Sequence, residues 1–302
     1  MSFIPIESIA SPANLISHVS DSDFILTSWA YHPITREVVE ACTSLKLIGH
    51  AAGSVKNIVA SEVFDRGIVV VNAAEPIARF VAEMALGFAI GLIRKIYQNS
   101  SQMKSEGAWR GELFKVDSLY EQSVGLVGLG LTARKFIQLL TPLNVKLYGY
   151  DPYISPQTAQ SLGVTLLDLD DLLEQCRIVS LHAALLPETR HLIDGRRLKL
   201  LRDGAILINT ARGGLIDEQA LYEELKTGRI SAGLDSFESE PLSPDSPLRH
   251  LGEHTILTPH MSGPAYYRRW ELGKHIVQQI RNFIQGEELQ VQVRKHTLNF
   301  IA

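Results

Sequence analysis

The second half of the sequence contains four side chains that can carry charge or move a proton, each a short distance after an apolar run. They are Arg212, Asp235, Glu240 and His260. A histidine can donate a proton near neutral pH, and a nearby carboxylate stabilises the imidazolium. An arginine can bind a carboxylate with two hydrogen bonds and polarise an adjoining carbonyl. This set suits the reduction of a ketone, because the alkoxide that forms needs a proton.

The elements that must position these side chains are short buried strands. From about residue 123, apolar runs at 124–127, 145–150, 178–181, 205–208, 230–234 and 255–257 alternate with helical patterns at 132–140, 169–176, 195–201 and 218–226. This alternation predicts a parallel sheet with helices on both faces. Ligands bind outside the carboxyl ends of such strands, so we expect the ionisable groups to meet at one edge of the sheet.

A glycine-rich turn joins the first of these strands to the helix after it, in the sequence V124-G-L-V-G128-L-G130-L-T-A133. The strand–turn–helix context is that of a dinucleotide-binding fingerprint. Gly128 permits a tight turn, and Gly130 lets the backbone approach a pyrophosphate at the helix N-terminus. Ala133 takes the third small position, where only close packing is required.

Asp151 follows the next strand, about 20 residues after the turn. A carboxylate there accepts hydrogen bonds from the adenosine ribose hydroxyls and repels a 2′-phosphate. We therefore predict NAD as the cofactor in preference to NADP. The alternative is a glycine-rich turn in some other α/β protein, which accounts less well for strand, turn, helix, second strand and acid together.

The first part of the chain shows the same alternation on a smaller scale. Strands are predicted at 24–27, 45–48 and 68–71, short helices at 35–41 and 57–64, and a long helix at 75–94. An amphipathic helix is predicted at 266–285, ending before Gly286. We expect two domains with a small-molecule cleft between them.

Longer blocks of sequence resemble the D-2-hydroxyacid dehydrogenases, the D-isomer specific family that includes phosphoglycerate dehydrogenases and glyoxylate/hydroxypyruvate reductases. The three most specific blocks are N209-T-A-R212-G-G-L-I-D217, G233-L-D235-S-F-E-S-E240-P-L and T258-P-H260-M-S-G. Further blocks are V179-S-L-H-A-A-L-L-P-E-T-R190, H50-A-A-G53-S-V-K-N57 and V81-A-E83-M-A-L-G. The resemblance runs from about residue 20 to the C-terminus.

The resemblance implies an α/β fold with a Rossmann doubly wound parallel sheet that binds NAD and a smaller flavodoxin-like substrate domain. We expect the substrate domain at 1–95, the NAD-binding domain at 96–270, and a C-terminal helix and tail at 271–302 that return to the substrate domain. The family's substrate domain opens with a strand–helix–strand unit, whereas the run at 24–27 resembles its third strand. Three explanations stay open: an N-terminal truncation, residues 1–20 in place of that unit, or a partner that covers the sheet edge.

The resemblance also implies roles for individual residues. Arg212 would bind the substrate carboxylate and keto oxygen, and His260 would be the acid/base with Glu240 as its partner. Backbone N–H groups at Ala52 and Gly53 would help to hold the substrate carboxylate. The expected cofactor contacts are Gly128, Gly130, Leu131, Thr132, Asp151, His182, Thr210, Ala211, Arg212, Asp235 and His260, with Asp235 bonded to the nicotinamide carboxamide. The expected substrate contacts are Ala52, Gly53, Arg212 and His260.

Two departures from the family pattern concern the substrate. Ala184 stands where the family often has proline, and S54-V-K-N57 replaces a common aspartate–asparagine pair. Lys56 would reach a substrate phosphate, although a solvated lysine at a helix start is the more frequent case. Substrate preference therefore cannot be copied from one family member.

The composition argues against several classes of partner and site. The chain has 302 residues and a net charge of −4, which gives no basic surface for nucleic acid or for an acidic membrane. The apolar stretch 80–93 is short for a membrane span and is typical of a buried helix. Two cysteines make no disulfide framework, and we expect a cytoplasmic protein. Acids at 168, 170 and 171 suit a helix start better than a metal, and no metal site is expected.

We therefore expect an NAD-dependent oxidoreductase that interconverts a small D-2-hydroxy acid and its 2-keto acid. Glyoxylate, hydroxypyruvate and 3-phosphohydroxypyruvate are the substrates that the resemblance suggests. One alternative is an NAD(H)-sensing, corepressor-like binding protein, because some relatives keep the catalytic residues and act in that way. Another alternative is an inactive, truncated member. The resemblance also suggests a homodimer built through the cofactor domains, with no nucleic-acid or membrane partner.

Overall fold

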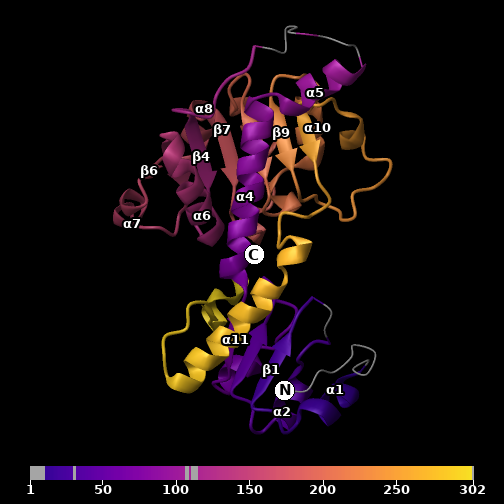
Figure 1. Ribbon diagram of the computed structural model, residues 1–302, viewed down its shortest axis with the longest axis vertical. Helices are drawn as coiled ribbons and strands as arrows, with labels where there is room; N and C mark the ends of the chain where they lie inside the picture. The colour runs from indigo at the N-terminus through magenta and orange to yellow at the C-terminus, as the bar shows by residue number, and fades with distance from the viewer. Residues whose placement is uncertain (1–10, 30–31, 106–108, 110–114, 301–302) are drawn as a thin grey trace. The chain divides into compact units, whose positions relative to one another are not determined.

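The computed structural model describes residues 11–29, 32–105, 109 and 115–300. These residues form two compact units, shown in Figure 1. The terminal unit contains the residues up to Ile77 together with those from Pro264 onward, and the central unit is Ala78–Gly263.

The boundaries of the units differ from the predicted ones at 95/96 and 270/271. Most of the long helix α4 (Ala74–Ile93) belongs to the central unit, where Phe88 and Leu92 lie in the hydrophobic core. A Cβ on Gly233 would lie 2.7 Å from the Phe88 ring, so this glycine allows the helix to pack closely on the sheet. By length and composition α4 is also apolar enough to cross a membrane, and half of that stretch is buried within the structure.

The central unit is built on a seven-stranded parallel sheet with the order β10-β9-β8-β7-β4-β5-β6. Its strands are β4 (Ser123–Val127), β5 (Lys146–Tyr150), β6 (Thr165–Leu166), β7 (Ile178–Leu181), β8 (Ile206–Asn209), β9 (Ser231–Leu234) and β10 (Thr255–Leu257). The chain adds β5 and β6 on one side of β4 and β7 to β10 on the other. The strand order therefore reverses between β4 and β7, which is where ligands bind in sheets of this type.

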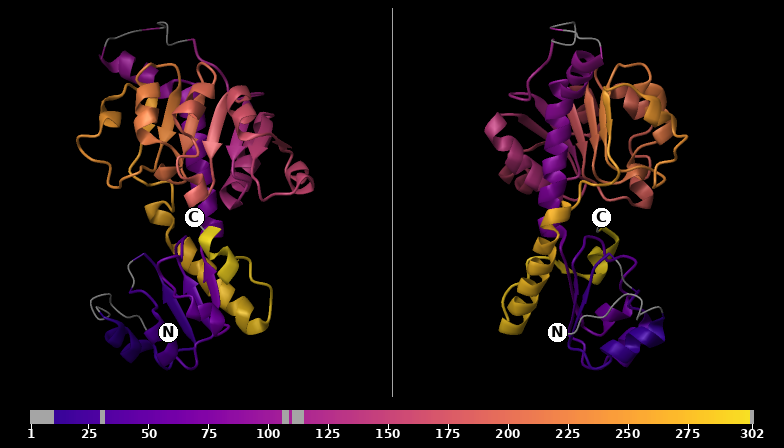
Figure 2. Two further views of the ribbon diagram at one scale, coloured as in Figure 1. Left: turned by 180° about the vertical axis from the view of Figure 1, so that it is seen from behind. Right: turned by 45° about the vertical axis from the view of Figure 1, so that its right-hand side comes forward.

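Helices cover both faces of this sheet and bury two separate cores (Figures 1 and 2). One core contains side chains of α4 and α6, and the other contains side chains of α8, α9 and α10. The remaining α-helices of the unit are α5 (Ile96–Ser105), α6 (Leu131–Leu140), α7 (Pro156–Ser161), α8 (Leu169–Gln175), α9 (Gly195–Leu200) and α10 (Glu218–Leu225). Short 3₁₀ turns occur at η3 (Thr141–Leu143), η4 (Pro187–Thr189), η5 (Gly213–Leu215) and η6 (Pro247–His250).

The acids at the start of α8 are explained by the fold. Asp170 binds Arg196 at 2.7 Å and Arg197 at 3.0 Å, both on α9, and hydrogen bonds from these two guanidinium groups lower the pKa of its carboxyl to about 2. The pairing joins two neighbouring helices on one face of the sheet.

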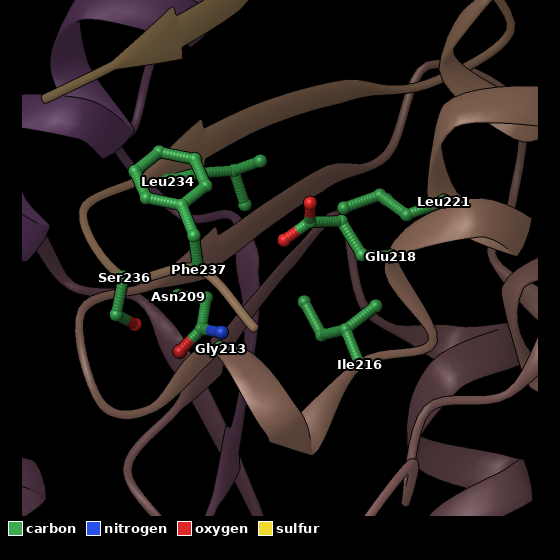
Figure 3. Close-up of a pocket in the computed structure, with 8 residues that line it drawn as sticks. All are labelled: Asn209, Gly213, Ile216, Glu218, Leu221, Leu234, Ser236 and Phe237. Atoms are coloured by element: carbon green, nitrogen blue, oxygen red, sulfur yellow. The ribbon is translucent and has the colours of Figure 1, made fainter. Parts of the chain in front are cut away.

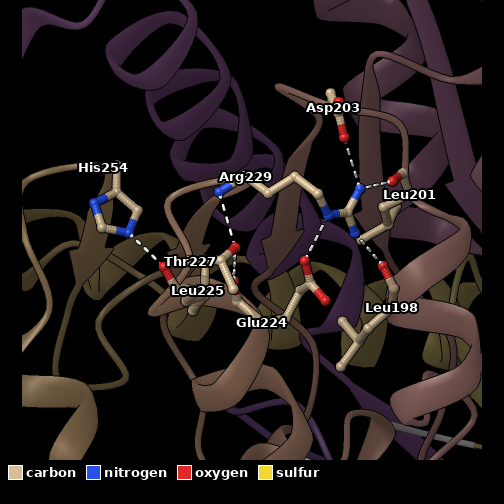
Figure 4. A network of polar contacts seen from close by, with 8 residues as sticks. All are labelled: Leu198, Leu201, Asp203, Glu224, Leu225, Thr227, Arg229 and His254. Carbon is tan, nitrogen blue, oxygen red and sulfur yellow. Dashed lines mark hydrogen bonds and ion pairs between the residues drawn. The ribbon is translucent and has the colours of Figure 1, made fainter.

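A polar network fastens the amino ends of the strands, opposite the carboxyl edge (Figure 4). Arg229, just before β9, donates to the carboxylate of Glu224 at 2.6 Å, to the Leu198 carbonyl at 2.9 Å and to the Leu201 carbonyl. The ring of His254 contacts the carbonyl of Leu225 at 3.0 Å. Because these contacts bind helix ends to loops, we interpret the network as structural.

The terminal unit has a four-stranded sheet with the order β1-β2-β3-β11. The strands β1 (Phe24–Thr27), β2 (Leu47–His50) and β3 (Val69–Asn72) are parallel, and β11 (Gln292–Val293) runs antiparallel to β3. Its helices are α1 (Pro12–Val19), α2 (Arg36–Ala41), α3 (Glu62–Asp65) and α11 (Trp270–Gln285), with 3₁₀ segments η7 (Tyr266–Arg268) and η8 (Lys295–Phe300).

Helix α11 packs on one face of the terminal sheet, and α1 to α3 bury the other. The fit of α11 is close: a Cβ on Gly49 of β2 would lie 2.4 Å from Cγ2 of Ile276. The helix begins at Trp270, four residues later than predicted, and ends before Gly286 as expected. Gly286 adopts a left-handed conformation (φ 72°) that caps the helix.

One prediction for the first part of the chain is corrected. The predicted helix at 57–64 is a helix only at Glu62–Asp65, because the Ile34 N–H binds the Ile58 carbonyl and the Ala60 N–H binds the Ile34 carbonyl, which forms a bridge instead. Residues 12–19 form α1, a helix ahead of the first strand. Residues 1–10, on which the expectation of a missing opening unit partly rests, lie outside the described residues.

Candidate active site

The glycine-rich turn lies at the carboxyl end of β4, beside the end of β7. Gly128 has φ +89°, and a Cβ there would lie 2.8 Å from the Ala183 nitrogen and 2.9 Å from the His182 carbonyl carbon. Only glycine suits both the conformation and this approach. Gly130 caps the N-terminus of α6, and a Cβ on it would meet no protein atom within 4 Å. This open space before a helix N-terminus fits the diphosphate of a dinucleotide.

Asp151 lies next to this turn, as predicted. Its Oδ2 accepts the Leu129 N–H at 2.8 Å, and its Oδ1 accepts the Tyr153 N–H at 2.9 Å. The carboxylate is therefore held in place by two backbone donors and stays partly exposed. This arrangement fits the binding of a ribose.

His182 occupies a different environment from the one expected of a cofactor contact. Both ring nitrogens are buried and have no hydrogen-bond partner among the described residues, and the ring packs 5.6 Å from that of Phe136 on α6. Desolvation lowers the pKa of His182 to about 3. The ring is thus neutral and closed off, and a bound cofactor would meet this segment at its backbone.

The turn after β8 holds Arg212. The side-chain amide of Asn209 donates to the Arg212 carbonyl at 2.9 Å, and its oxygen accepts the Ala211 N–H at 3.1 Å. Burial lowers the pKa of the Arg212 guanidinium, and the charge of Glu240 acts in the opposite direction. A partly desolvated cation of this kind binds a carboxylate strongly. The neighbouring Thr210 hydroxyl is buried and has no partner among the described residues, so it too fits a ligand contact.

His260 and Glu240 form a direct pair. Nδ1 of His260 lies 2.6 Å from Oε2 of Glu240, and Oε1 of Glu240 accepts the Phe237 N–H at 3.0 Å. Because a carboxylate only accepts, Nδ1 carries the hydrogen and Nε2 remains to exchange a proton. The histidine side chain is 49% exposed, so a substrate can reach it. The peptide bond between Glu240 and Pro241 is cis.

Asp235 has a positioning role that the sequence did not indicate. Its carboxylate accepts the Thr258 hydroxyl at 2.5 Å, the Met261 N–H at 2.9 Å and the Ser262 N–H at 2.8 Å. These bonds fix the segment on either side of His260, whose own backbone is left-handed (φ 50°). The expected contact with the nicotinamide carboxamide stays a prediction, and Asp235 would have to make it with its remaining lone pairs.

The two residues expected to hold the substrate carboxylate, Ala52 and Gly53, belong to the terminal unit. They follow β2 and are anchored to the end of β3: the Ala52 carbonyl accepts the Ala73 N–H at 3.0 Å, and the Gly53 carbonyl accepts the Asn72 side-chain amide at 2.7 Å. Asn72 therefore supports the turn of the predicted site, a role that was not predicted, and its position at a strand end was the available signal.

Comparison with known proteins agrees with this geometry. Residues 86–262 match the NAD-binding domain of the D-isomer specific 2-hydroxyacid dehydrogenases. A Thermotoga maritima hydroxypyruvate reductase is 34% identical over 249 residues, which cover 82% of this chain and 80% of that protein. The chain belongs to the D-isomer specific 2-hydroxyacid dehydrogenase family. The central unit is accordingly the family's NAD-binding domain, and its doubly wound sheet confirms the predicted fold class.

Other family members are longer, and one solved structure is closely similar. D-3-phosphoglycerate dehydrogenase from Methanocaldococcus jannaschii is 37% identical over 275 residues, which cover 90% of this chain and 52% of that protein. The chain thus spans about half the length of the first curated relatives that it matches. A crystal structure of a Pyrococcus horikoshii protein has a TM-score of 0.77 and 31% identity, covering 96% of this chain and 88% of that one.

Proposed function

We propose that the chain is an NAD-dependent oxidoreductase that interconverts a small D-2-hydroxy acid and its 2-keto acid. The single observation that carries this proposal is the contact of 2.6 Å between His260 and Glu240 at the carboxyl edge of the NAD-binding sheet. When bound, the nicotinamide supplies or accepts a hydride. The glycine turn, Asp151 and the Thr210–Arg212 segment are the residues that would hold the cofactor.

In this proposal the chain's own residues bind the acid and handle the proton. Arg212 binds the substrate carboxylate and polarises the keto oxygen, because a guanidinium that burial partly desolvates interacts strongly with an anion. His260 gives the proton from Nε2, while Glu240 holds Nδ1 and stabilises the imidazolium. In the terminal unit, binding of a substrate carboxylate by the backbone N–H groups of the Ala52–Gly53 turn stays a prediction. Hydroxypyruvate and 3-phosphohydroxypyruvate head the substrate panel, since relatives carry the names of the corresponding enzymes.

The test is turnover of a panel of 2-keto acids with NADH, followed by the absorbance of the reduced nicotinamide. We expect turnover of at least one acid, and a loss of about 10²- to 10⁴-fold in His260→Gln, because a general acid contributes about that factor. Binding of NADH, measured by fluorescence, should persist in the variant. NADH binding without turnover of any acid would contradict the proposal and favour an NAD(H)-sensing protein, and no binding at all would indicate an inactive member.

We also propose a cytoplasmic homodimer built through the central unit. The support is a group of exposed apolar side chains on α5, namely Ile96, Tyr97 and Met103, each about half exposed. Large exposed apolar groups at neighbouring positions are typical of protein interfaces.

A further inference from the structure

A second histidine–glutamate pair lies on the loop that carries Glu240. Nε2 of His191 contacts Oε1 of Glu238, two residues before Glu240. The other pair is His260 with Glu240. Both histidines have a left-handed backbone, with φ +50°. The His260–Glu240 pair carries the proposed proton transfer, whereas the proposed function gives the His191–Glu238 pair no role.

The orientation of Glu240 depends on the peptide bond between Ser236 and Phe237, one peptide before Glu238. Oε1 of Glu240 accepts the Phe237 N–H at 3.0 Å, so a shift of this stretch would turn the carboxylate away from His260. The adjoining Glu238 N–H donates to Oε2 of Glu218 at 3.0 Å. Burial raises the pKa of the Glu218 carboxyl, which lies in a small pocket with Phe237 and Ser236 (Figure 3).

The next peptide, between Phe237 and Glu238, packs directly against the Arg212 turn. A Cβ on Gly213 would lie 1.8 Å from the Phe237 carbonyl carbon and 2.3 Å from the Glu238 nitrogen, so the two backbones are in direct contact. A movement of this loop would therefore displace the backbone of the Arg212 turn as well as the carboxylate of Glu240.

His191 closes this arrangement from a third segment. Its N–H donates to the Gly214 carbonyl at 2.8 Å, and the Ile193 N–H donates to the Leu215 carbonyl at 2.9 Å. Segment 191–193 is thus fixed to the Arg212 turn, the Arg212 turn to the Glu238 peptide, and Glu238 through its side chain to His191. Three segments form a closed frame, and the His191–Glu238 contact is its side-chain bond.

We propose that His191 is a positioning residue that acts through Glu238 to hold Glu240 against His260. This inference rests on the proposed function, since it concerns the same acid/base pair. His191 itself touches neither substrate nor cofactor in this assignment. A hydrogen bond to a charged group is worth enough for its loss to change a rate by about tenfold.

The test compares His191→Ala, His191→Gln and Glu238→Gln with the unmodified chain. We expect kcat of the 2-keto acid reduction to fall about tenfold in His191→Ala, with the KM for NADH changed less than twofold. The pH at which kcat falls on the alkaline side should decrease, because a displaced Glu240 stabilises the His260 imidazolium less. The other charged groups near His260, Arg212 and Asp235, are unchanged in the variant. His191→Gln should recover part of the rate, since its amide can still donate to Glu238. Lys226→Ala, which removes an exposed ion pair with Glu223 on the same unit, is the matched control and should change neither value.

Two results would overturn the inference. One is an unchanged kcat and pH profile in both His191→Gln and His191→Ala, or in Glu238→Gln if the alanine variant does not fold. The other is a loss of NADH binding and a fall in thermal stability that accompany the loss of kcat, which would indicate general unfolding. If the unmodified chain turns over no 2-keto acid, the proposed function fails, and NMR titration of the His260 ring still tests the positioning: the midpoint must shift in His191→Gln or Glu238→Gln, and an unchanged midpoint rejects it.

Discussion

We propose that cofactor choice depends on Asp151. Two backbone N–H groups hold its carboxylate beside the glycine turn, so under the ribose assignment its fixed charge would repel a 2′-phosphate. We predict that Asp151→Ser raises the NADPH to NADH ratio of kcat/KM by about tenfold or more, which corresponds to about 1.4 kcal/mol of repulsion removed. Asp170→Asn on α8 removes an acid that pairs with arginines and should leave the ratio unchanged. An unchanged ratio in Asp151→Ser would reject the ribose assignment.

We predict that His182 makes the stability of the protein depend on pH, because burial lowers its pKa. Its pKa is about 3 in the folded chain, against 6.5 for an exposed histidine. Between these values the unfolded state binds a proton that the folded state does not, so stability falls as the pH falls. One such group costs about 2 kcal/mol at pH 5.

We therefore predict that His182→Leu reduces the loss of unfolding free energy between pH 7 and pH 5 by about 2 kcal/mol, measured by urea unfolding. The substitution also removes two buried nitrogens that have no hydrogen-bond partner within the described part of the chain. His18→Gln, at an exposed position of α1, is the control and should keep the pH dependence. Equal pH slopes in the unmodified chain and in His182→Leu would show that another group is responsible.

The limits of sequence reasoning are also visible in single residues. The types and spacing of Arg212, Glu240 and His260 were enough to predict that they meet at one sheet edge, because parallel strands end together. The three hydrogen bonds to the Asp235 carboxylate were not predictable from the sequence, because their donors lie at 258–262, after the next strand, β10. The His191–Glu238 contact spans 47 positions and involves two loops, for which no periodic pattern exists.

At the scale of elements, the positions of strands were predicted more accurately than the sheet on which each helix packs. The runs at 178–181 and 255–257 match β7 and β10, because buried parallel strands are continuously apolar. The assignment of α4 to the substrate domain was wrong, since an apolar helix does not reveal which sheet it packs on. The helix predicted at 57–64 forms only in part, because Val59 pairs with Ile34 in a β-bridge instead of continuing a helix.

The packing of α11 on the terminal sheet gives a prediction at this scale. Gly49→Ala should destabilise the chain by about 1–3 kcal/mol, because the new methyl group meets Cγ2 of Ile276. Ile276→Leu moves the branch point of this side chain from its Cβ to its Cγ at nearly constant volume. The double variant should therefore be more stable than the sum of the two single changes predicts, as measured by a double-mutant cycle.

A control for this cycle lies on the same helix. A Cβ on Gly273 would meet no atom within 4 Å, so Gly273→Ala should stabilise the chain slightly through helix propensity. Strict additivity of Gly49→Ala and Ile276→Leu would mean that the helix shifts freely on the sheet, contrary to the packing described.

At the scale of the whole molecule, the proposed dimer can be tested by mass in solution. Light scattering should give twice the chain mass for the unmodified protein. Ile96→Glu combined with Met103→Glu should give the mass of one chain, because a buried carboxylate without a partner is costly at an interface. Leu139→Glu, at another exposed apolar position on α6, is the matched control. A single-chain mass for the unmodified protein would contradict the dimer.

The terminal unit is made from two stretches on either side of Ala78–Gly263, and this has a consequence for synthesis on the ribosome. The strands β1 to β3 emerge early, whereas α11, which covers Leu47 and Val71 on one face of their sheet, is translated only after Ala78–Gly263. At about 5–20 residues per second, that interval lasts roughly 10 to 40 s. During this time the central unit can fold on its own residues, while the nascent N-terminal sheet presents an apolar face that a chaperone can bind.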